Sequence, residues 1–201
     1  MQWSKLKKQV ESRFASSMAG RVELRTTHYR HSHDSEGRGW ITIDKQEVHN
    51  FCTLKFWIEQ NALLEGIRSA NNVTNYRDPA QRAGYYHAYE QAEAILDQRG
   101  VRSQGWFEES LRDYLSLTLE EGLASTNFLH RALAVIDKRL GKRRLKVLQL
   151  SPGEHPLVSR FLELRRAAEF PAPVAGAASG EAPDDPPADT ESPVPCRPLP
   201  P

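Results

Sequence analysis

The spacing of apolar residues predicts an amphipathic helix at the start of the chain and β-strands after it. The first apolar residues recur every three or four positions, as one face of a helix requires, and beyond Gly20 the interval falls to two, as in a half-buried strand. These residues are Trp3, Leu6, Val10 and Phe14 for the helix, and Val22, Leu24 and Thr26 for the strand. Turn-forming residues at 34–39 and 44–47 separate further β-prone runs, so we predict an antiparallel hairpin with a short third strand at 48–51.

After the strands the apolar spacing is helical and predicts about five helices. The clearest boundary is Asp78, an N-cap residue followed by Pro79, with Gln81 placed to accept from the backbone amide of the cap. The longest helix is predicted to begin at 125–127 and to continue, kinked at Gly141, through a run of basic residues. All four tryptophans are expected to face inward: Trp3, Trp40, Trp57 and Trp106.

These elements predict an α+β fold, in which the leading helix and a small antiparallel sheet pack against a layer of about five helices. The chain has 201 residues, and we expect residues 1–170 to form one domain. Ten of the thirteen prolines fall in 171–201, among Ala, Gly, Ser and acidic residues. A segment so poor in apolar bulk cannot offset the entropy of ordering it, so a disordered acidic tail is predicted there.

Composition excludes several classes of protein. The only cysteines are Cys52 and Cys196, so the chain is not a disulfide scaffold and a reducing compartment is expected. No apolar run approaches the length of a membrane span, and the first residues are charged rather than apolar. The sequence therefore predicts a cytoplasmic protein with no membrane partner. No cofactor is expected, because no phosphate-binding, dinucleotide-binding, hydrolase or zinc-protease motif occurs.

The charge distribution points to an anionic partner. The net charge of +1 combines about +5 on residues 1–170 with −4 on the tail. Two rows of basic side chains would align on the predicted long helix. The rows comprise Lys138, Lys142 and Lys146, with Arg139 and Arg143 beside them. This pattern predicts a non-enzymatic binding module for nucleic acid or an acidic protein. The alternative is that the acid-rich segment 108–121 neutralises these cations within the chain.

Two other functions stay open from the sequence. A small enzyme could use Arg30, Arg38 and Asp44, which the predicted hairpin would bring near a cleft between sheet and helices. A metal site could use His31 and His33, which share one face of a strand. Neither set matches an established catalytic or zinc-binding pattern, and the sequence does not indicate an oligomeric state.

Several short segments together resemble a known family. They are Met1-Gln-Trp-Ser-Lys-Leu-Lys-Lys8, Gly20-Arg-Val-Glu23, Tyr29-Arg30, Gly37-Arg38, Ile43-Asp44, Arg77-Asp78, Arg131-Ala-Leu-Ala134, Asp137-Lys-Arg-Leu-Gly-Lys-Arg-Arg-Leu145 and Glu154-His-Pro-Leu157. The chain is similar in these segments to a family of small bacterial proteins known only as hypothetical. The resemblance covers most of residues 1–170 and supports those domain limits. It implies no activity, cofactor or catalytic residue.

Overall fold

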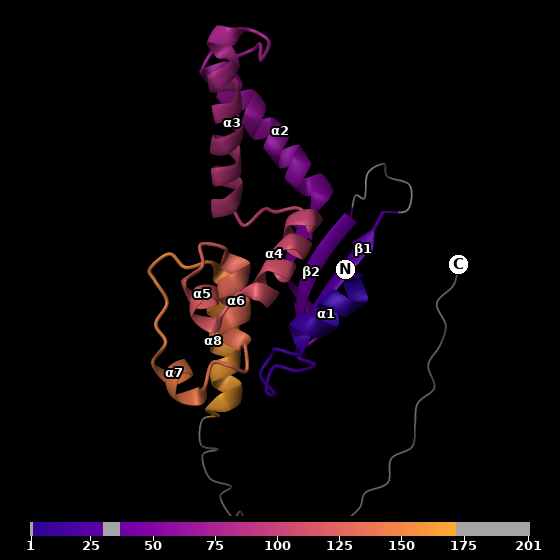
Figure 1. Ribbon diagram of the computed structural model, residues 1–201, viewed down its shortest axis with the longest axis vertical. Coiled ribbons are helices and arrows are strands. Elements are labelled where there is room, and N and C mark those ends of the chain that lie inside the picture. Colours follow the sequence, from indigo (N-terminus) through magenta and orange to yellow (C-terminus); the bar gives the residue numbers. More distant parts are fainter. Residues whose placement is uncertain (1, 30–36, 172–201) are drawn as a thin grey trace, which may run out of the picture. The chain divides into compact units, whose positions relative to one another are not determined.

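The computed structural model describes residues 2–29 and 37–171, and contacts group the chain up to Pro171 into one unit (Figure 1). The elements are α1 (Trp3–Glu11), β1 (Val22–His28), β2 (Gly37–Ile43), β3 (Gln46–Cys52), α2 (Thr53–Ala70), α3 (Pro79–Gln98), α4 (Gln104–Ser116), α5 (Leu119–Ala124), α6 (Phe128–Ile136), α7 (Lys142–Val147) and α8 (Pro156–Glu169). The α+β prediction is confirmed, including the leading helix and the small sheet. The predicted tail lies outside the described residues.

The sheet is antiparallel with the order β1-β2-β3, so the predicted third strand is present. Asp44 and Lys45 both have positive φ angles, 49° and 69°, which is the backbone of a two-residue turn that matches the twist of paired strands. Residues Leu24 and Ile41 are fully buried in the main core. At Gly39 a Cβ atom would lie 2.4 Å from the ring of Phe107, so a glycine lets α4 pack closely on β2.

The most apolar helix of the described chain is α6, in which every residue except Arg131 is buried. It packs against α4, α5 and α8. Arginine side chains are mostly exposed in proteins, but that of Arg165 on α8 is buried. Its guanidinium donates to the carbonyls of Val135, Asp137 and Leu140 at 2.6 to 2.8 Å. The reason is that carbonyls at a helix end lack partners within the helix, and Arg165 supplies the missing donors.

The single long helix predicted through the basic run is wrong. Helix α6 ends at Ile136, Asp137 adopts an extended conformation, and α7 begins only at Lys142. The backbone at this break pairs with the segment after α1 instead. The amide of Ala15 donates to Ile136 O at 2.8 Å, and the amide of Lys138 donates to Arg13 O at 2.7 Å. These bonds replace the helical ones that a continuous helix would have made.

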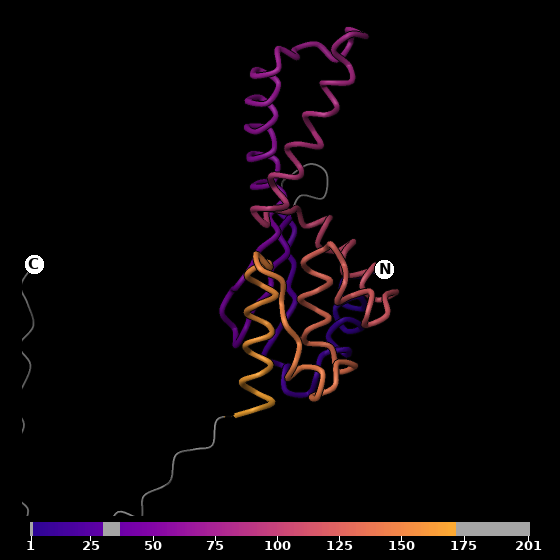
Figure 2. The backbone as a smooth tube through the Cα atoms, turned by 90° about the vertical axis from the view of Figure 1, so that its left-hand side faces the viewer, coloured from indigo at the N-terminus to yellow at the C-terminus, as the bar shows by residue number. Residues whose placement is uncertain are grey.

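Helices α2 and α3 run side by side and share a small core of their own (Figure 2). It consists of Leu64, Ala88 and Ala92, with Leu63 and Ile67 against it. Asp78 caps α3 as predicted, accepting from the amide of Ala80 at 2.9 Å. Gln81 does not bond the amide of the cap, because its side-chain oxygen accepts from the amides of Thr74 and Asn75. Trp57 on α2 is exposed, which contradicts the inward orientation expected for it.

Candidate functional site

The predicted anion-binding rows are not aligned, and internal groups already engage part of them. Arg139 forms a two-pronged ion pair with Asp137, whose carboxylate oxygens accept from its Nε at 3.0 Å and from its Nη2 at 2.8 Å. Lys142 pairs with Glu169 at 2.8 Å. Lys138 donates to the carbonyl of Ser12 at 2.8 Å. Three of the five cations of the predicted rows are therefore already engaged by groups of the protein itself.

Arg143 and Lys146, both on α7, form no ion pair with another described residue. Arg144, which lies between them, forms a two-pronged pair with Glu120 at 2.7 Å for both bonds. Glu120 belongs to the acid-rich segment 108–121, so the alternative of internal neutralisation holds for this cation. Of the two predicted rows, Arg143 and Lys146 thus remain without a carboxylate partner in the described part of the chain.

The residues proposed for an enzyme do not converge. Arg30 lies outside the described residues. Arg38 pairs with Glu47 and stacks 4.9 Å above the ring of Trp40, whereas Asp44 accepts from Arg21 at 2.7 and 2.9 Å. Positions 38 and 44 stand near opposite ends of β2, about 20 Å apart at the rise of a strand. Arg38 and Asp44 therefore serve separate surface ion pairs.

The proposed metal ligands His31 and His33 also lie outside the described residues. Within residues 2–29 and 37–171, no three histidine, cysteine or acidic side chains are placed together as metal ligands would be.

A different set of residues does converge, around His49 and His155. The imidazole of His49 on β3 lies 5.3 Å from that of His155, which caps the start of α8 by accepting from the amide of Leu157 at 3.2 Å. The ring of Phe128 stacks on His155 at 3.9 Å between ring centres. Gly100 approaches both imidazoles so closely that a Cβ atom there would lie 2.6 Å from His155 Nε2. The φ angle of +66° at Gly100 also favours glycine.

Two adjoining cavities of about 270 Å³ and 190 Å³ share Val48, His49 and Arg99, and His155 lines the larger one. We call the larger one the His–Arg pocket. It is lined by Val48, His49, Gln98, Arg99, His155, Pro156, Leu157 and Arg160. Arg99 follows the last residue of α3, and Arg160 lies on the first turns of α8. Neither arginine forms an ion pair with a described residue, and the lining of the pocket includes no described carboxylate.

Cations also line the smaller cavity, and apart from Arg99, which lines both cavities, they are already paired. Lys55 lies 3.7 Å from Glu59, and Arg102 pairs with Asp97 while it covers the ring of Trp106 at 5.2 Å. Of the two cavities, the His–Arg pocket therefore holds both guanidinium groups that lack a described carboxylate partner, those of Arg99 and Arg160.

The histidines of this pocket are neutral at pH 7. Burial, together with the nearby His155, lowers the pKa of His49 to about 4, although an interaction with the backbone of Gly100 opposes the shift. Burial also lowers the pKa of His155, against the opposing effect of the Glu154 carboxylate. Each imidazole can therefore offer one N–H donor or one acceptor without adding charge.

An ion pair between α6 and the segment before α8 holds His155 in position. Arg131 on α6 donates to both carboxylate oxygens of Glu154 at 2.7 to 3.1 Å. Glu154 in turn accepts from the amide of His155 at 2.8 Å. The segments Arg131-Ala-Leu-Ala134 and Glu154-His-Pro-Leu157 are thus joined directly, and together they position one side of the pocket.

Sequence reasoning missed this pocket, because its residues come from separate parts of the chain. Its residues His49, Arg99 and Arg160 are not among the anion-binding, catalytic or metal-binding candidates named above from the sequence. The one available signal was Glu154-His-Pro-Leu157, in which a histidine stands directly before a helix-starting proline.

Comparison with known proteins places the chain in a sequence family and does not extend to function. Residues 2–166 match the SF0329 protein family. No curated protein and no solved structure matches the chain. Among the helices that the structure describes, none has the length and apolarity to cross a membrane.

Proposed function

This chain belongs to the SF0329 protein family, and we propose that it is a non-enzymatic binding module that holds an anionic ligand in the His–Arg pocket. One observation carries the proposal: Arg99 and Arg160 line the same cavity, and neither forms an ion pair with a described carboxylate. Other arginines that line a cavity or a buried site in the described chain have an internal partner, as Arg102, Arg131 and Arg139 do.

The chemistry of the lining suits a phosphate or carboxylate group. A guanidinium presents parallel N–H donors whose geometry matches two oxygens of such an anion. The neutral imidazole of His155, whose Nδ1 accepts from the amide of Leu157, carries its N–H at Nε2 and adds a donor that needs no countercharge. A volume of about 270 Å³ is slightly below the usual range for sites that enclose a whole drug-sized molecule. The pocket therefore fits a small anion or the anionic end of a larger ligand.

The same charge balance argues against the basic run as the main binding surface. Lys142 and Arg139 would have to leave Glu169 and Asp137 before they could bind an external anion. Within the described chain, Arg143 and Lys146 of the predicted rows are free of such competition, and they provide an internal comparison for the proposal. The proposal keeps the anionic class of partner that the sequence predicts, but it assigns the binding site to the pocket at the start of α8 instead of to α7.

Titration calorimetry with inorganic phosphate, pyrophosphate and citrate tests the proposal. We expect the tightest of these probes to lose about 100-fold or more in affinity in Arg99→Gln/Arg160→Gln, because at least two charge-assisted hydrogen bonds of about 1.5 to 3 kcal/mol each are removed. The matched control is Arg143→Gln/Lys146→Gln, which removes the same charge from α7 and should bind as the unaltered protein does.

Two outcomes would reject the pocket. Equal weakening in the two double variants would mean that only the overall charge matters. Absence of measurable binding for all three probes at millimolar concentration would exclude a small-anion site. If the α7 variant alone weakened binding of an oligonucleotide, the remaining basic surface on α7 would become the preferred site.

A further inference from the structure

Helix α3 carries a stripe of exposed residues, one of which, Tyr89, also contacts Arg68 of the neighbouring helix α2. The residues are spaced by four, three and four positions, which places them on one line along the helix. They are Arg82, Tyr86, Tyr89 and Glu93. All four are exposed in the described structure, and Tyr86 is the more exposed of the two tyrosines, at 57%. We call this set the α3 stripe.

The stripe is symmetric about its own midpoint. A cation stands at one end, a carboxylate at the other, and two tyrosines lie at equal distances on either side of the centre. If a second α3 lies antiparallel along the first, Arg82 of each copy meets Glu93 of the other, and Tyr86 meets Tyr89. A twofold interface has this property, because residue i contacts residue j and residue j contacts residue i. In a parallel arrangement like charges would face each other.

The groups on the stripe are available for such contacts. Glu93 forms no ion pair with a described residue, and the only side-chain hydrogen bond of Arg82 among those residues is a long one, 3.4 Å to the carbonyl of Tyr76. Glu90, one turn away, is already engaged with His87 at 3.0 Å. Arg82 and Glu93 are therefore free to form the pairs that the antiparallel arrangement would bring together.

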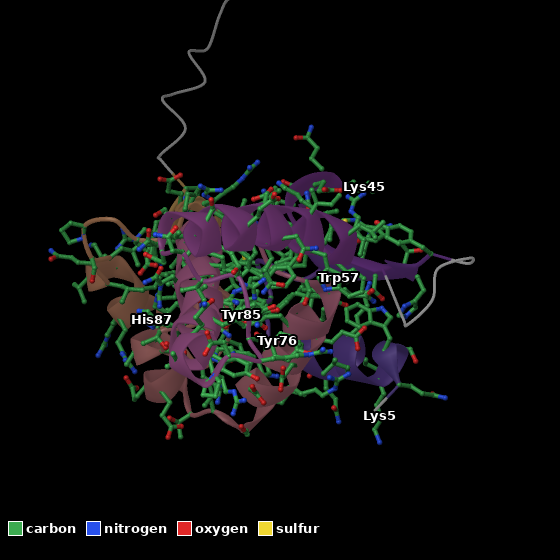
Figure 3. All side chains as sticks on the ribbon, turned by 90° about the horizontal axis from the view of Figure 1, so that it is seen from above. Lys5, Lys45, Trp57, Tyr76, Tyr85 and His87 are labelled. Atoms are coloured by element: carbon green, nitrogen blue, oxygen red, sulfur yellow. The ribbon has the colours of Figure 1, made fainter. Side chains whose placement is uncertain are left out.

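The surface beside the stripe is rich in aromatic residues. The guanidinium of Arg68 on α2 lies 3.6 Å from the ring centre of Tyr85 and 4.8 Å from that of Tyr89. Tyr76 packs against Tyr85 at 5.6 Å, and Figure 3 shows these two residues on the same side of α2 as Trp57. Tyrosine, tryptophan and arginine are the residues enriched at the energetic centres of protein interfaces.

The exposed aromatic side chains could supply about half of the area that each partner of a stable dimer buries. Trp57, Tyr76, Tyr86 and Tyr89 are each 37% to 57% exposed. With about 150 to 250 Å² per aromatic side chain, they expose about 400 Å² in each copy. Their neighbours on the helices would be covered with them, which brings the interface toward the roughly 800 Å² per partner of a stable complex. The α2–α3 pair, whose own core consists of three buried side chains, has the most to gain from such burial.

We propose that a second copy of this chain binds along the α3 stripe, in antiparallel orientation, to form a twofold dimer. Arg82 pairs across the interface with the Glu93 of the other copy, and the tyrosines form its centre. This inference is independent of the His–Arg pocket, whose residues lie elsewhere in the chain.

Sedimentation velocity over a range of concentrations tests the dimer. The chain has a mass of 22.8 kDa, and we expect the mass obtained from sedimentation to be twice this value at high concentration and to fall toward it on dilution. Arg82→Glu and Glu93→Arg should each weaken the dimer about tenfold or more, because each change creates two like-charge contacts. A mixture of these two variants should restore it, since every contact across the mixed dimer then joins opposite charges.

Two controls distinguish contact along the α3 stripe from a general effect of charge and from unfolding. Lys55→Glu changes a charge on α2 away from the stripe and should leave the mass unchanged, and circular dichroism should confirm that every variant is folded. A monomer at all concentrations would overturn the proposal. So would dimers that are unaffected by the single variants, or a mixture that associates no better than either variant alone.

Discussion

Arg139 is predicted to stabilise the fold rather than to bind a ligand, and Arg139→Gln tests this directly. Asp137 is fully buried and accepts from the hydroxyl of Tyr114 at 2.5 Å, from the amide of Arg139 at 2.8 Å and from the guanidinium of Arg139. Burial acts to raise the pKa of Asp137, but the bonds from Arg139 and Tyr114 outweigh it and hold the pKa below its ordinary value. The carboxylate is thus ionised inside the core, and Arg139 supplies its compensating charge.

The magnitude follows from what the substitution leaves behind. Removing one partner of a buried ion pair costs about 3 to 5 kcal/mol, because the other charge stays buried. The side chain of Arg139 is 35% exposed, so water screens part of the pair, and we expect a smaller loss than this range, about 2 to 3 kcal/mol. For a domain of this size that corresponds to a fall in Tm of about 5 to 10 °C.

Chemical denaturation and thermal unfolding at neutral pH measure the effect, with two matched controls. Lys142→Gln and Arg143→Gln remove the same charge from the same basic run, but the Lys142 side chain is 69% exposed and Arg143 has no described carboxylate partner. Both should change stability by about 1 kcal/mol or less. Equal destabilisation by all three substitutions would refute the reasoning, because overall charge rather than the buried pair would then account for the loss.

The pH dependence gives a second check on the same pair. In the unaltered protein the folded pKa of Asp137 lies below its ordinary value of 3.8, so the stability it contributes is present above that value and is lost as the pH falls through the folded pKa. In Arg139→Gln burial would dominate and raise the pKa of Asp137, so protonation would relieve the cost. The stability gap between the two proteins should therefore narrow as the pH is lowered toward 4.

Three further predictions concern the pocket and the helices. The pKa of His49 is about 4 in the folded protein and 6.5 ordinarily. Protonation of His49 should therefore leave the free energy of unfolding unchanged above pH 6.5 and lower it, by at most about 3 kcal/mol, as the pH drops to 4. His49→Phe should remove this part of the dependence in denaturation series at several pH values, and an unchanged profile would contradict the neutral, buried state. Gly100→Ala should lower Tm by several degrees, because its Cβ would lie 2.6 Å from His155 Nε2 at a positive φ. An unchanged Tm would mean that the imidazole of His155 moves aside at little cost in free energy. Gly66→Ala, within α2 and with no atom near the added Cβ, should instead stabilise the fold by about 0.5 to 1 kcal/mol, and a loss of stability would show that the helix surface there is in contact with something.

Local chemistry determined much of the fold from the sequence alone. The intervals of the apolar residues set the type of α1 and β1, because burial of one face requires that period. Cap residues set the starts of three helices: Asp78, Ser103 and Asn127 each accept from an amide in the first turn, as their short polar side chains allow. These features depend on residues within a few positions of one another, so the chain displays them before it folds.

The tertiary structure decided where the basic run breaks: Gly141, where the sequence predicted only a kink, marks the start of α7, and no local signal marked the end of α6 at Ile136. The apolar pattern is compatible with a continuous helix, because it includes Ile136, Leu140 and Leu145. Instead, the buried side chain of Asp137 bonds Tyr114 and Arg139, and the backbone around it bonds the segment after α1. The gain from these contacts exceeds the gain from continuing the helix, and it depends on residues more than twenty or even a hundred positions away.

The His–Arg pocket depends on the same kind of long-range meeting. His49, Arg99 and His155 belong to three segments that touch only when β3, the end of α3 and the start of α8 pack together. The sequence by itself determined that this chain has a basic body and where several of its helices begin. Only the folded chain decided which cations are matched by carboxylates and which are left to face a cavity, because pairing depends on distances in space that the order of residues does not contain.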